Sequence, residues 1–332
     1  MTAASTSTPR RAFVTRSLPG RALADLASRV ELRVWPERRP PTRDELRAHA
    51  AGCDGLLCLL TDRIDASFLD ACPGLRAVSS VSVGVDHVDL AAATARGIPI
   101  GHTPGVLTET TADLSFALLL AAARRVAEGD RFVRAGHWVP ERVWEPDMLL
   151  GHDVHGATLG LVGLGAIGQA VARRAAGFGM RVLAWSRTRR EIPGVACCEL
   201  ADLLAAADFV SVHVALTDAT RGLLDATAIA RMKPGAILVN TARGGIVDEA
   251  ALAEALRTGR LAGAALDVFA REPLDPASPL LALPNVVLTP HIGSASEATR
   301  ARMASLAVRN LEAALAGERM PHCANPAVYD RR

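Results

Sequence analysis

Aromatic residues, excess charge of one sign and long apolar runs are all scarce in this 332-residue sequence. Phe, Trp and Tyr together make up 4% of the residues, so nothing indicates an aromatic-lined pocket. The 37 basic residues are nearly balanced by 35 acidic ones and are scattered along the chain, which argues against a nucleic-acid-binding surface. The longest apolar run, LSFALLLAAA, is too short to cross a bilayer, so we expect no membrane partner.

The six cysteines show neither CxxC spacing nor a Cys/His pattern typical of metal sites. We therefore predict no metal site, and reduced thiols in a cytoplasmic protein. The opening MTAASTSTPRRAF contains two arginines but no apolar segment of signal-peptide length after them, which agrees with that location. The cysteines are Cys53, Cys58, Cys72, Cys197, Cys198 and Cys323.

Short apolar runs alternate with helical stretches, as in AFVTRSL, RALADLASR, VELRVW, TRDELRAHAA and GLLCLL. This alternation predicts a parallel sheet with helices on its faces. It starts again at ATLGLVGLG and continues to NVVLTP, so we predict two α/β units in series. If the second unit covers 102–287, both chain ends belong to the first, which then comprises 1–101 and 288–332.

The region between the two alternating patterns differs from both. The pattern predicts a long helical stretch over about 108–135, and the segment 136–157, which is rich in Trp, Pro and His, predicts an irregular excursion. A last helix is expected over about 295–316.

The motif LVGLGAIG lies between an apolar strand and a helix. Gly163 permits a tight turn, Gly165 lets the backbone approach a pyrophosphate, and Gly168 allows close packing of helix and strand. The helix that starts at Ala166 and Ile167 offers unpaired N–H groups to phosphates. Together these features predict a dinucleotide-binding site.

No carboxylate stands at the end of the next strand, RVLAW, where an NAD site usually carries Asp or Glu. The strand leads instead to Ser186, Arg187, Thr188, Arg189 and Arg190. Hydroxyl and guanidinium groups suit a 2′-phosphate, because arginine makes charge-assisted, bidentate bonds to phosphate oxygens. We therefore favour NADP(H), with NAD(H) as the alternative if the turn is only a solvated basic segment.

Ionisable side chains follow three successive strands of the second unit. AILVNTA leads to Arg243, GAALDV carries Asp267, and NVVLTP leads to His291. Because ligands bind beyond the carboxyl ends of the strands in an open parallel sheet, we expect these side chains on one rim. Glu272, five residues after Asp267, is expected within reach of the imidazole.

These residue types suit hydride transfer to a small 2-oxo acid. The developing alkoxide needs a proton, which a histidinium supplies, and a carboxylate partner orients the imidazole and favours its charged form. Arginine can hold the substrate carboxylate and polarise the carbonyl. We therefore predict Arg243, Glu272 and His291 as the catalytic set. The structural alternatives are a surface arginine, a solvated glutamate and a buried histidine, with Asp267 capping a turn.

Six motifs in combination carry a family resemblance over nearly the whole chain. They are VSVGVDHVDL, ARGIPIGHTPGVLTETTADL, GLVGLGAIGQAVARR, VNTARGGIVDEAAL, LDVFAREP and TPHIGSAS. The sequence resembles the D-2-hydroxyacid dehydrogenases, and within them the glyoxylate/hydroxypyruvate reductases. This resemblance implies two doubly wound parallel-sheet domains, a Rossmann cofactor domain inserted into a flavodoxin-like substrate domain. It also implies NAD(P)H-dependent reduction of glyoxylate or hydroxypyruvate to the D-2-hydroxy acid, and a homodimer.

The resemblance also implies residue roles. Trp138 resembles a tryptophan that reaches the neighbouring subunit's active site, with core packing as the alternative. The substrate-binding candidates are Val83 and Gly84 through their N–H groups, Trp138, Arg243, His291 and Ser294. The cofactor-binding candidates are Gly163, Gly165, Ala166, Ile167, Gly168, Ser186, Arg187, Thr188, Val214, Ala215, Leu216, Thr241, Ala242, Asp267 and Gly293.

Two alternatives to this activity stay open. The same three catalytic candidates are compatible with phosphite, 3-phosphoglycerate or a bulky 2-oxo acid as substrate. A dinucleotide-sensing corepressor-type binding protein is less well supported, because we expect such a protein to carry extra partner-binding segments.

Overall fold

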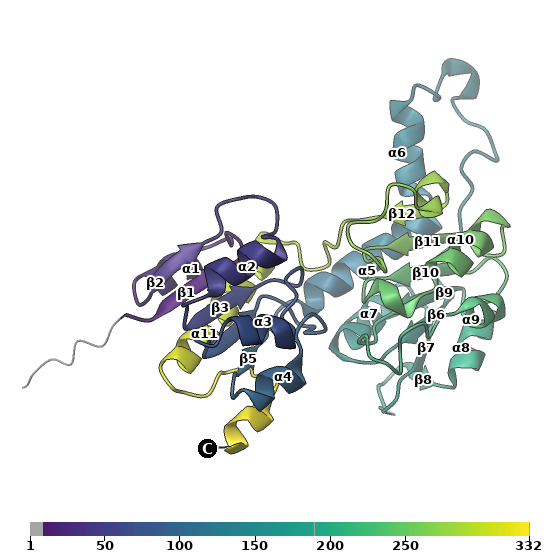
Figure 1. Cartoon of the computed structure of the whole chain (residues 1–332). Coiled ribbons are helices and arrows are strands. Elements are labelled where there is room, and N and C mark those ends of the chain that lie inside the picture. The colour runs from purple at the N-terminus through teal and green to yellow at the C-terminus, as the bar shows by residue number, and fades with distance from the viewer. Residues whose placement is uncertain (1–8, 189, 332) are drawn as a thin grey trace, which may run out of the picture. The chain divides into compact units, whose positions relative to one another are not determined.

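The computed structural model describes residues 9–188 and 190–331. The chain divides into two compact units (Figure 1), of which unit 1 comprises 1–107 and 295–332, and unit 2 comprises 108–294. Within the described residues, no helix combines the length and apolar character that crossing a membrane requires.

Unit 1 contains a five-stranded sheet in which every strand pair is parallel. Its strand order is β2-β1-β3-β4-β5, which is the flavodoxin-like order. The strands are β1 (Arg11–Val14), β2 (Glu31–Val34), β3 (Gly55–Cys58), β4 (Ala77–Ser80) and β5 (Ile100–Gly101). The helices are α1 (Ala22–Ala27), α2 (Arg43–Ala50), α3 (Ala66–Ala71), α4 (Leu90–Ala95) and α11 (Glu297–Leu315).

Alternating side chains of this sheet enter two separate cores, as the two-residue period of a strand requires. Phe13 packs with residues of α2, α3 and α4 on one face, whereas Ala12 and Val14 pack with α1 and α11 on the other. The short helices begin at capping side chains: Asp65 accepts a hydrogen bond from Phe68 N–H at the start of α3, and Asp89 caps α4 in the same way.

Unit 2 contains a seven-stranded sheet, also parallel throughout. Its order, β12-β11-β10-β9-β6-β7-β8, is the Rossmann order with one added strand, and the strand order reverses between β6 and β9. The strands are β6 (Thr158–Val162), β7 (Arg181–Trp185), β8 (Val195–Cys197), β9 (Phe209–Val212), β10 (Ile237–Asn240), β11 (Gly263–Leu266) and β12 (Val286–Leu288). The helices are α5 (Thr108–Ala123), α6 (Val126–Arg134), α7 (Ala166–Ala176), α8 (Leu200–Ala206), α9 (Ala226–Arg231) and α10 (Glu249–Arg257).

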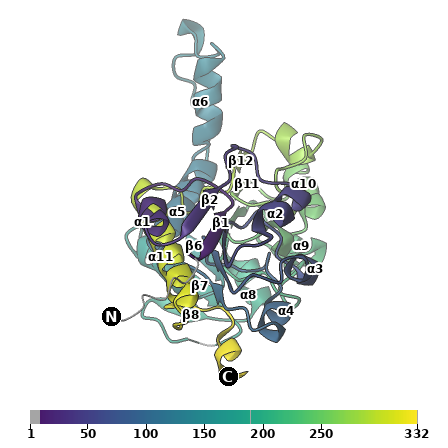
Figure 2. The same cartoon turned by 60° about the vertical axis from the view of Figure 1, so that its left-hand side comes forward.

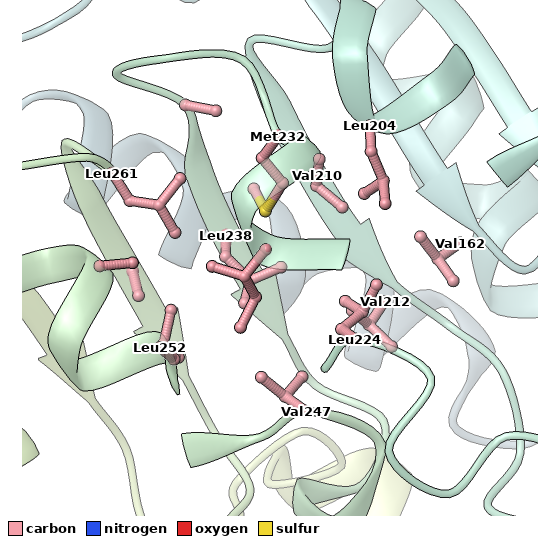
Figure 3. Close-up of a cluster of buried hydrophobic side chains, with 14 of the residues drawn as sticks. Val162, Leu204, Val210, Val212, Leu224, Met232, Leu238, Val247, Leu252 and Leu261 are labelled. Carbon is pink, nitrogen blue, oxygen red and sulfur yellow. The ribbon is translucent and has the colours of Figure 1, made fainter. Parts of the chain in front are cut away.

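Helices also cover both faces of the second sheet. In β10, Leu238 enters the core beneath α8, α9 and α10 (Figure 3), whereas Ile237 and Val239 enter the core beneath α5 and α7. The predicted fold class, two doubly wound parallel-sheet units of Rossmann and flavodoxin-like type, is therefore confirmed.

The predicted helical stretch over about 108–135 consists of two helices. The first helix, α5, ends at Ala123, and Arg125 then adopts a left-handed conformation with φ +53° before α6 begins. The carbonyl of Ala123 accepts a hydrogen bond from His152 N–H instead of from the next helical turn. The segment that contains His152 thus bonds to the end of α5 and interrupts the helical stretch. Local periodicity cannot reveal a contact of this kind.

The helix α6 and the segment that follows it form an arm, residues 126–150, which contains one short 3₁₀ helix (Pro140–Arg142). In Figures 1 and 2 this arm extends away from the other elements of unit 2, and no side chain of α6 is buried. The predicted irregular excursion after the helix is confirmed in this segment.

Candidate active site

The glycine turn after β6 leaves no room for side chains at two of its positions. A Cβ at Gly163, whose φ is +112°, would lie 2.7 Å from the carbonyl carbon of His213, and a Cβ at Gly168 would lie 2.2 Å from the Gly163 carbonyl oxygen. At Gly165 a Cβ would meet nothing within 4 Å, so one face of the backbone is open. An open backbone at the start of the eleven-residue helix α7 fits the pyrophosphate of a dinucleotide.

The loops on either side of this turn contain the other cofactor candidates. Val214 N lies 2.8 Å from the Cβ position of Gly163, so the 214–216 loop directly adjoins the glycine turn. After β7, the Ser186 hydroxyl donates to the Thr188 carbonyl at 2.6 Å, while Arg187 is exposed to solvent. Arg189, part of the predicted arginine-rich turn, lies outside the described residues.

His213 follows β9 and lies directly against the glycine turn. Its Nε2 lies 2.9 Å from the Ser211 hydroxyl, and burial lowers the pKa of its imidazole from 6.5 to about 4. The unfolded chain therefore takes up a proton near pH 6.5 that the folded chain resists until about pH 4. The stability that neutral His213 contributes is complete above pH 6.5 and is lost as the pH falls toward about 4.

We expect His213→Gln to make the protein less sensitive to acid. Between pH 7 and pH 5 the melting temperature of the wild type should fall further than that of the variant, because glutamine does not titrate. Thermal unfolding followed by circular dichroism measures both. The matched control is His155→Gln, which removes an exposed histidine and should follow the wild type. Equal losses in wild type and His213→Gln would contradict the expectation.

The imidazole of His291 is paired with the carboxylate of Glu272. His291 Nδ1 lies 2.8 Å from Glu272 Oε2, while Glu272 Oε1 accepts a hydrogen bond from Phe269 N–H at 3.0 Å. Burial opposes ionisation of Glu272, but hydrogen bonding and attraction from His291, together with Phe269 N–H and Arg243, lower the pKa of this carboxyl group. Since the ionised carboxylate can only accept, Nδ1 carries a hydrogen and Nε2 is the nitrogen left for proton exchange.

Asp267 is fully buried and organises the loop that carries His291. Its Oδ1 accepts from the Thr289 hydroxyl at 2.6 Å and from Ile292 N–H at 2.8 Å, and its Oδ2 accepts from Gly293 N–H at 2.8 Å. These bonds hold His291 at φ +55°, a conformation that only a well-determined environment maintains in a non-glycine residue. The contacts are those of a turn-capping residue, and contact of Asp267 with the cofactor stays a prediction.

Arg243 lies directly beyond β10, next to the loop that contains Glu272. The backbones of the two loops touch at Gly244, where a Cβ would lie 1.8 Å from the carbonyl carbon of Phe269. The Asn240 side chain fixes the Arg243 segment, because its Nδ2 donates to Arg243 O at 2.9 Å and its Oδ1 accepts from Ala242 N–H at 3.0 Å. Arg243, Glu272 and His291 are thus brought together at the carboxyl ends of β10, β11 and β12.

Two hydroxyl groups of α5 were not among the predicted site residues. The Ser115 hydroxyl lies 2.7 Å from that of Thr241, and the Thr111 hydroxyl donates to Gly293 O at 3.1 Å. Both side chains are buried. Through these two hydrogen bonds, α5 fixes the loops that follow β10 and β12. Their spacing of four residues within an apolar helix, which places two hydroxyls on one face, is the signal that could have identified them.

The remaining substrate candidates lie in three places. Ser294 follows Gly293 at the end of unit 2, and Val83 and Gly84 follow β4 in unit 1. Trp138 lies in the arm, is 55% exposed, and donates from its indole nitrogen to Val143 O. The arm contacts the amino end of β12, where Arg131 donates to Pro284 O, so the structure does not bring Trp138 to the strand ends that carry His291 in the same chain.

Comparisons with known proteins agree with this geometry. The family model described as D-isomer specific 2-hydroxyacid dehydrogenase, NAD binding domain, matches residues 116–293. A glyoxylate reductase of Korarchaeum cryptofilum is 51% identical over 326 residues, covering 97% of this chain and 98% of that protein. A glyoxylate reductase of Aeropyrum pernix is 48% identical over 327 residues, with the same coverage.

Solved structures show the same similarity. A protein from Thermus thermophilus superposes with a TM-score of 0.90 at 53% identity, covering 95% of this chain and 99% of that one. An NADPH-dependent glyoxylate/hydroxypyruvate reductase from Sinorhizobium meliloti, solved with NADP and malonate, superposes with a TM-score of 0.87 at 35% identity, covering 98% and 99%.

Proposed function

This chain belongs to the D-isomer specific 2-hydroxyacid dehydrogenase family, and from that premise we propose that it reduces glyoxylate or hydroxypyruvate to the D-2-hydroxy acid. The observation that carries the proposal is the His291–Glu272 pair, 2.8 Å apart, on the same sheet edge as the open glycine turn. A proton donor and a dinucleotide cradle on one edge are the two parts that carbonyl reduction needs.

His291, Glu272 and Arg243 have separate roles in the proposed reaction. The glycine turn after β6 would hold a nicotinamide dinucleotide, which would supply a hydride for reduction of the substrate carbonyl. Protonated His291 gives the proton on Nε2 to the carbonyl oxygen, while Glu272 holds Nδ1 and compensates the positive charge of the ring. Arg243 binds the substrate carboxylate and draws charge from the carbonyl oxygen.

A steady-state assay tests this function. We expect saturable oxidation of NADPH with glyoxylate or hydroxypyruvate, measured beside pyruvate and 3-phosphohydroxypyruvate and repeated with NADH. Absence of turnover with all four 2-oxo acids would contradict the proposal. A preference for pyruvate or 3-phosphohydroxypyruvate would keep the reaction type and correct the substrate.

A preference for NADP(H) over NAD(H) is part of the proposal. It is supported by the exposed side chain of Arg187 directly after β7, where no carboxylate stands to bind a free 2′-hydroxyl. The Ser186 hydroxyl already donates to Thr188 O, so Arg187 is the better placed group for a 2′-phosphate.

We expect Arg187→Ala to raise the KM for NADPH about tenfold, because one charge-assisted bond to phosphate is lost, and to leave the KM for NADH almost unchanged. Initial rates with both cofactors at saturating glyoxylate measure the effect. Arg181→Ala is the matched control, since Arg181 is an exposed arginine at the opposite end of the same strand. An equal change for both cofactors would disprove recognition of the 2′-phosphate.

A homodimer and a cytoplasmic location complete the proposal. The arm carries exposed apolar side chains, among them Trp144 at 79% and Leu150 at 65%, and such a cluster is typical of an interaction surface. With a second copy as partner, light scattering should give twice the mass of 34.8 kDa.

The six cysteines are free thiols, as expected in a reducing compartment.

A further inference from the structure

The helix α5 packs against β10, β11 and β12, the three strands whose carboxyl ends lead to Arg243, Glu272 and His291. Among the side chains that this helix buries, those of Thr111 and Ser115 carry hydroxyl groups and the others are apolar. A buried hydroxyl destabilises a fold unless it finds a hydrogen-bond partner. The partners of these two groups therefore indicate what they do.

The hydroxyl group of Ser115 accepts a hydrogen bond from the loop after β10. Its single hydrogen is donated to Thr111 O at 2.7 Å. The second contact of this hydroxyl, with Thr241 Oγ1 at 2.7 Å, is therefore a bond that Thr241 donates and Ser115 accepts. Because a hydroxyl bond to the carbonyl four residues back does not stabilise a helix, the contribution of Ser115 is the acceptor that it offers to Thr241.

The hydroxyl group of Thr111 holds the loop after β12. It donates to Gly293 O at 3.1 Å, while Gly293 N–H donates to Asp267 Oδ2 at 2.8 Å, so this glycine is bonded on both sides. The packing is close, since a Cβ at Gly293 would lie 3.3 Å from Asp267 Oδ2 and 3.5 Å from Thr111 Cγ2. One turn of α5 thus carries a bond to each of the two loops.

Both bonded loop residues lie close in sequence to a group that acts in the proposed reaction. Thr241 precedes Arg243 by two residues, and Gly293 follows His291 by two residues. The reaction needs the guanidinium that binds the substrate carboxylate and the imidazole that gives the proton at a constant separation. A misplacement of about 1 Å can cost about 100-fold in rate. A turn of helix that is bonded to both loops keeps this separation fixed.

We propose that Thr111 and Ser115 are positioning residues that set the separation between Arg243 and His291 by fixing both loops to one turn of α5. This inference rests on the proposed function and adds two residues that act through the loops and not by contact with the substrate. Their contribution is pre-organisation, because the two loops hold their spacing before the substrate binds.

The kinetic test compares variants that differ in one hydroxyl group. Thr111→Val keeps the shape of the side chain and removes its donor, Ser115→Ala removes the acceptor for Thr241, and Thr111→Ser keeps the donor. In the first two, kcat for glyoxylate should fall about tenfold, the effect of losing one hydrogen bond. The KM for NADPH should change less than about twofold. In Thr111→Ser, kcat should stay within about threefold of the wild type.

Two further variants separate positioning from a general loss of stability. The double variant Thr111→Val/Ser115→Ala should be hardly slower than either single variant, because losing one bond already releases the two loops from each other. A loss of about 100-fold in the double variant would show independent effects and contradict a shared spacing. The matched control is Ser305→Ala, which should have wild-type kinetics. Ser305 Oγ donates to Ala301 O at 3.0 Å and, among the described residues, bonds nothing outside α11.

Hydrogen exchange of the full chain, followed by mass spectrometry, tests the two bonds without turnover. Exchange in the peptide covering 289–294 should be about tenfold faster in Thr111→Val, and exchange in 240–244 about tenfold faster in Ser115→Ala. A wild type that reduces no 2-oxo acid would contradict the proposed function, and the exchange rates would then decide whether the hydroxyls hold the loops. Unchanged exchange in both variants would overturn the positioning role. So would faster exchange with a normal kcat.

Discussion

His291→Asn should lower kcat for glyoxylate reduction by about 100- to 10,000-fold, the range expected when a general acid is lost. Asparagine is the informative replacement because it tolerates the left-handed backbone that His291 adopts at φ +55°, so the loop should keep its shape. Its amide cannot give up a proton near neutral pH, so the developing alkoxide has to be protonated by water.

Stopped-flow or steady-state NADPH oxidation measures this loss, and fluorescence titration measures NADPH binding. Binding should stay within about twofold of the wild type, because the glycine turn and α7 are unchanged. His155→Asn, the same substitution at an exposed histidine, should have normal kinetics. A kcat within about tenfold of the wild type for His291→Asn would remove the general-acid role.

Arg243→Lys should lower kcat/KM for glyoxylate by about 100-fold, chiefly through KM. The ammonium keeps the charge but not the planar fork, which can bind a carboxylate through two parallel bonds at about 1.5–3 kcal/mol each. Lysine also lacks the second nitrogen with which Arg243 reaches other groups, such as Nη1 donating to Ala242 O at 2.9 Å. The substrate would then be held at one point instead of two.

The matched control is Arg257→Lys on the exposed surface of α10, where the arginine pairs with Glu254 at 2.7 Å. Such a pair contributes little, so this variant should be indistinguishable from the wild type. If Arg243→Lys kept a normal KM for glyoxylate while the KM for NADPH rose, Arg243 would belong to the cofactor site and not to the substrate site.

The positions of Arg243, Asp267 and His291 could be predicted because strand topology determines where they lie. Apolar strands were evident around AILVNTA, GAALDV and NVVLTP, and the carboxyl ends of neighbouring parallel strands meet at one edge. Nothing further was needed to expect Arg243, Asp267 and His291 together. The pairing of Glu272 with His291 was within reach for the same reason, since Glu272 is only five residues beyond Asp267.

Residues that only support other parts of the site could not be predicted in the same way. Ser115 lies inside an apolar helix, so it does not differ locally from an ordinary structural position. Its partner, Thr241 O–H, becomes apparent only from three-dimensional placement. The break at Arg125 is of the same kind, because the cause, His152 N–H, lies far along the chain.

The contact at Gly244 has a mechanical consequence. With the two backbones meeting where a Cβ would lie 1.8 Å from Phe269, the peptide carrying the guanidinium cannot slide past the peptide leading to Glu272. We therefore expect the loop that carries Arg243 and the loop that carries Glu272 to move together. The spacing between the guanidinium and the carboxylate is then expected to stay the same from one turnover to the next.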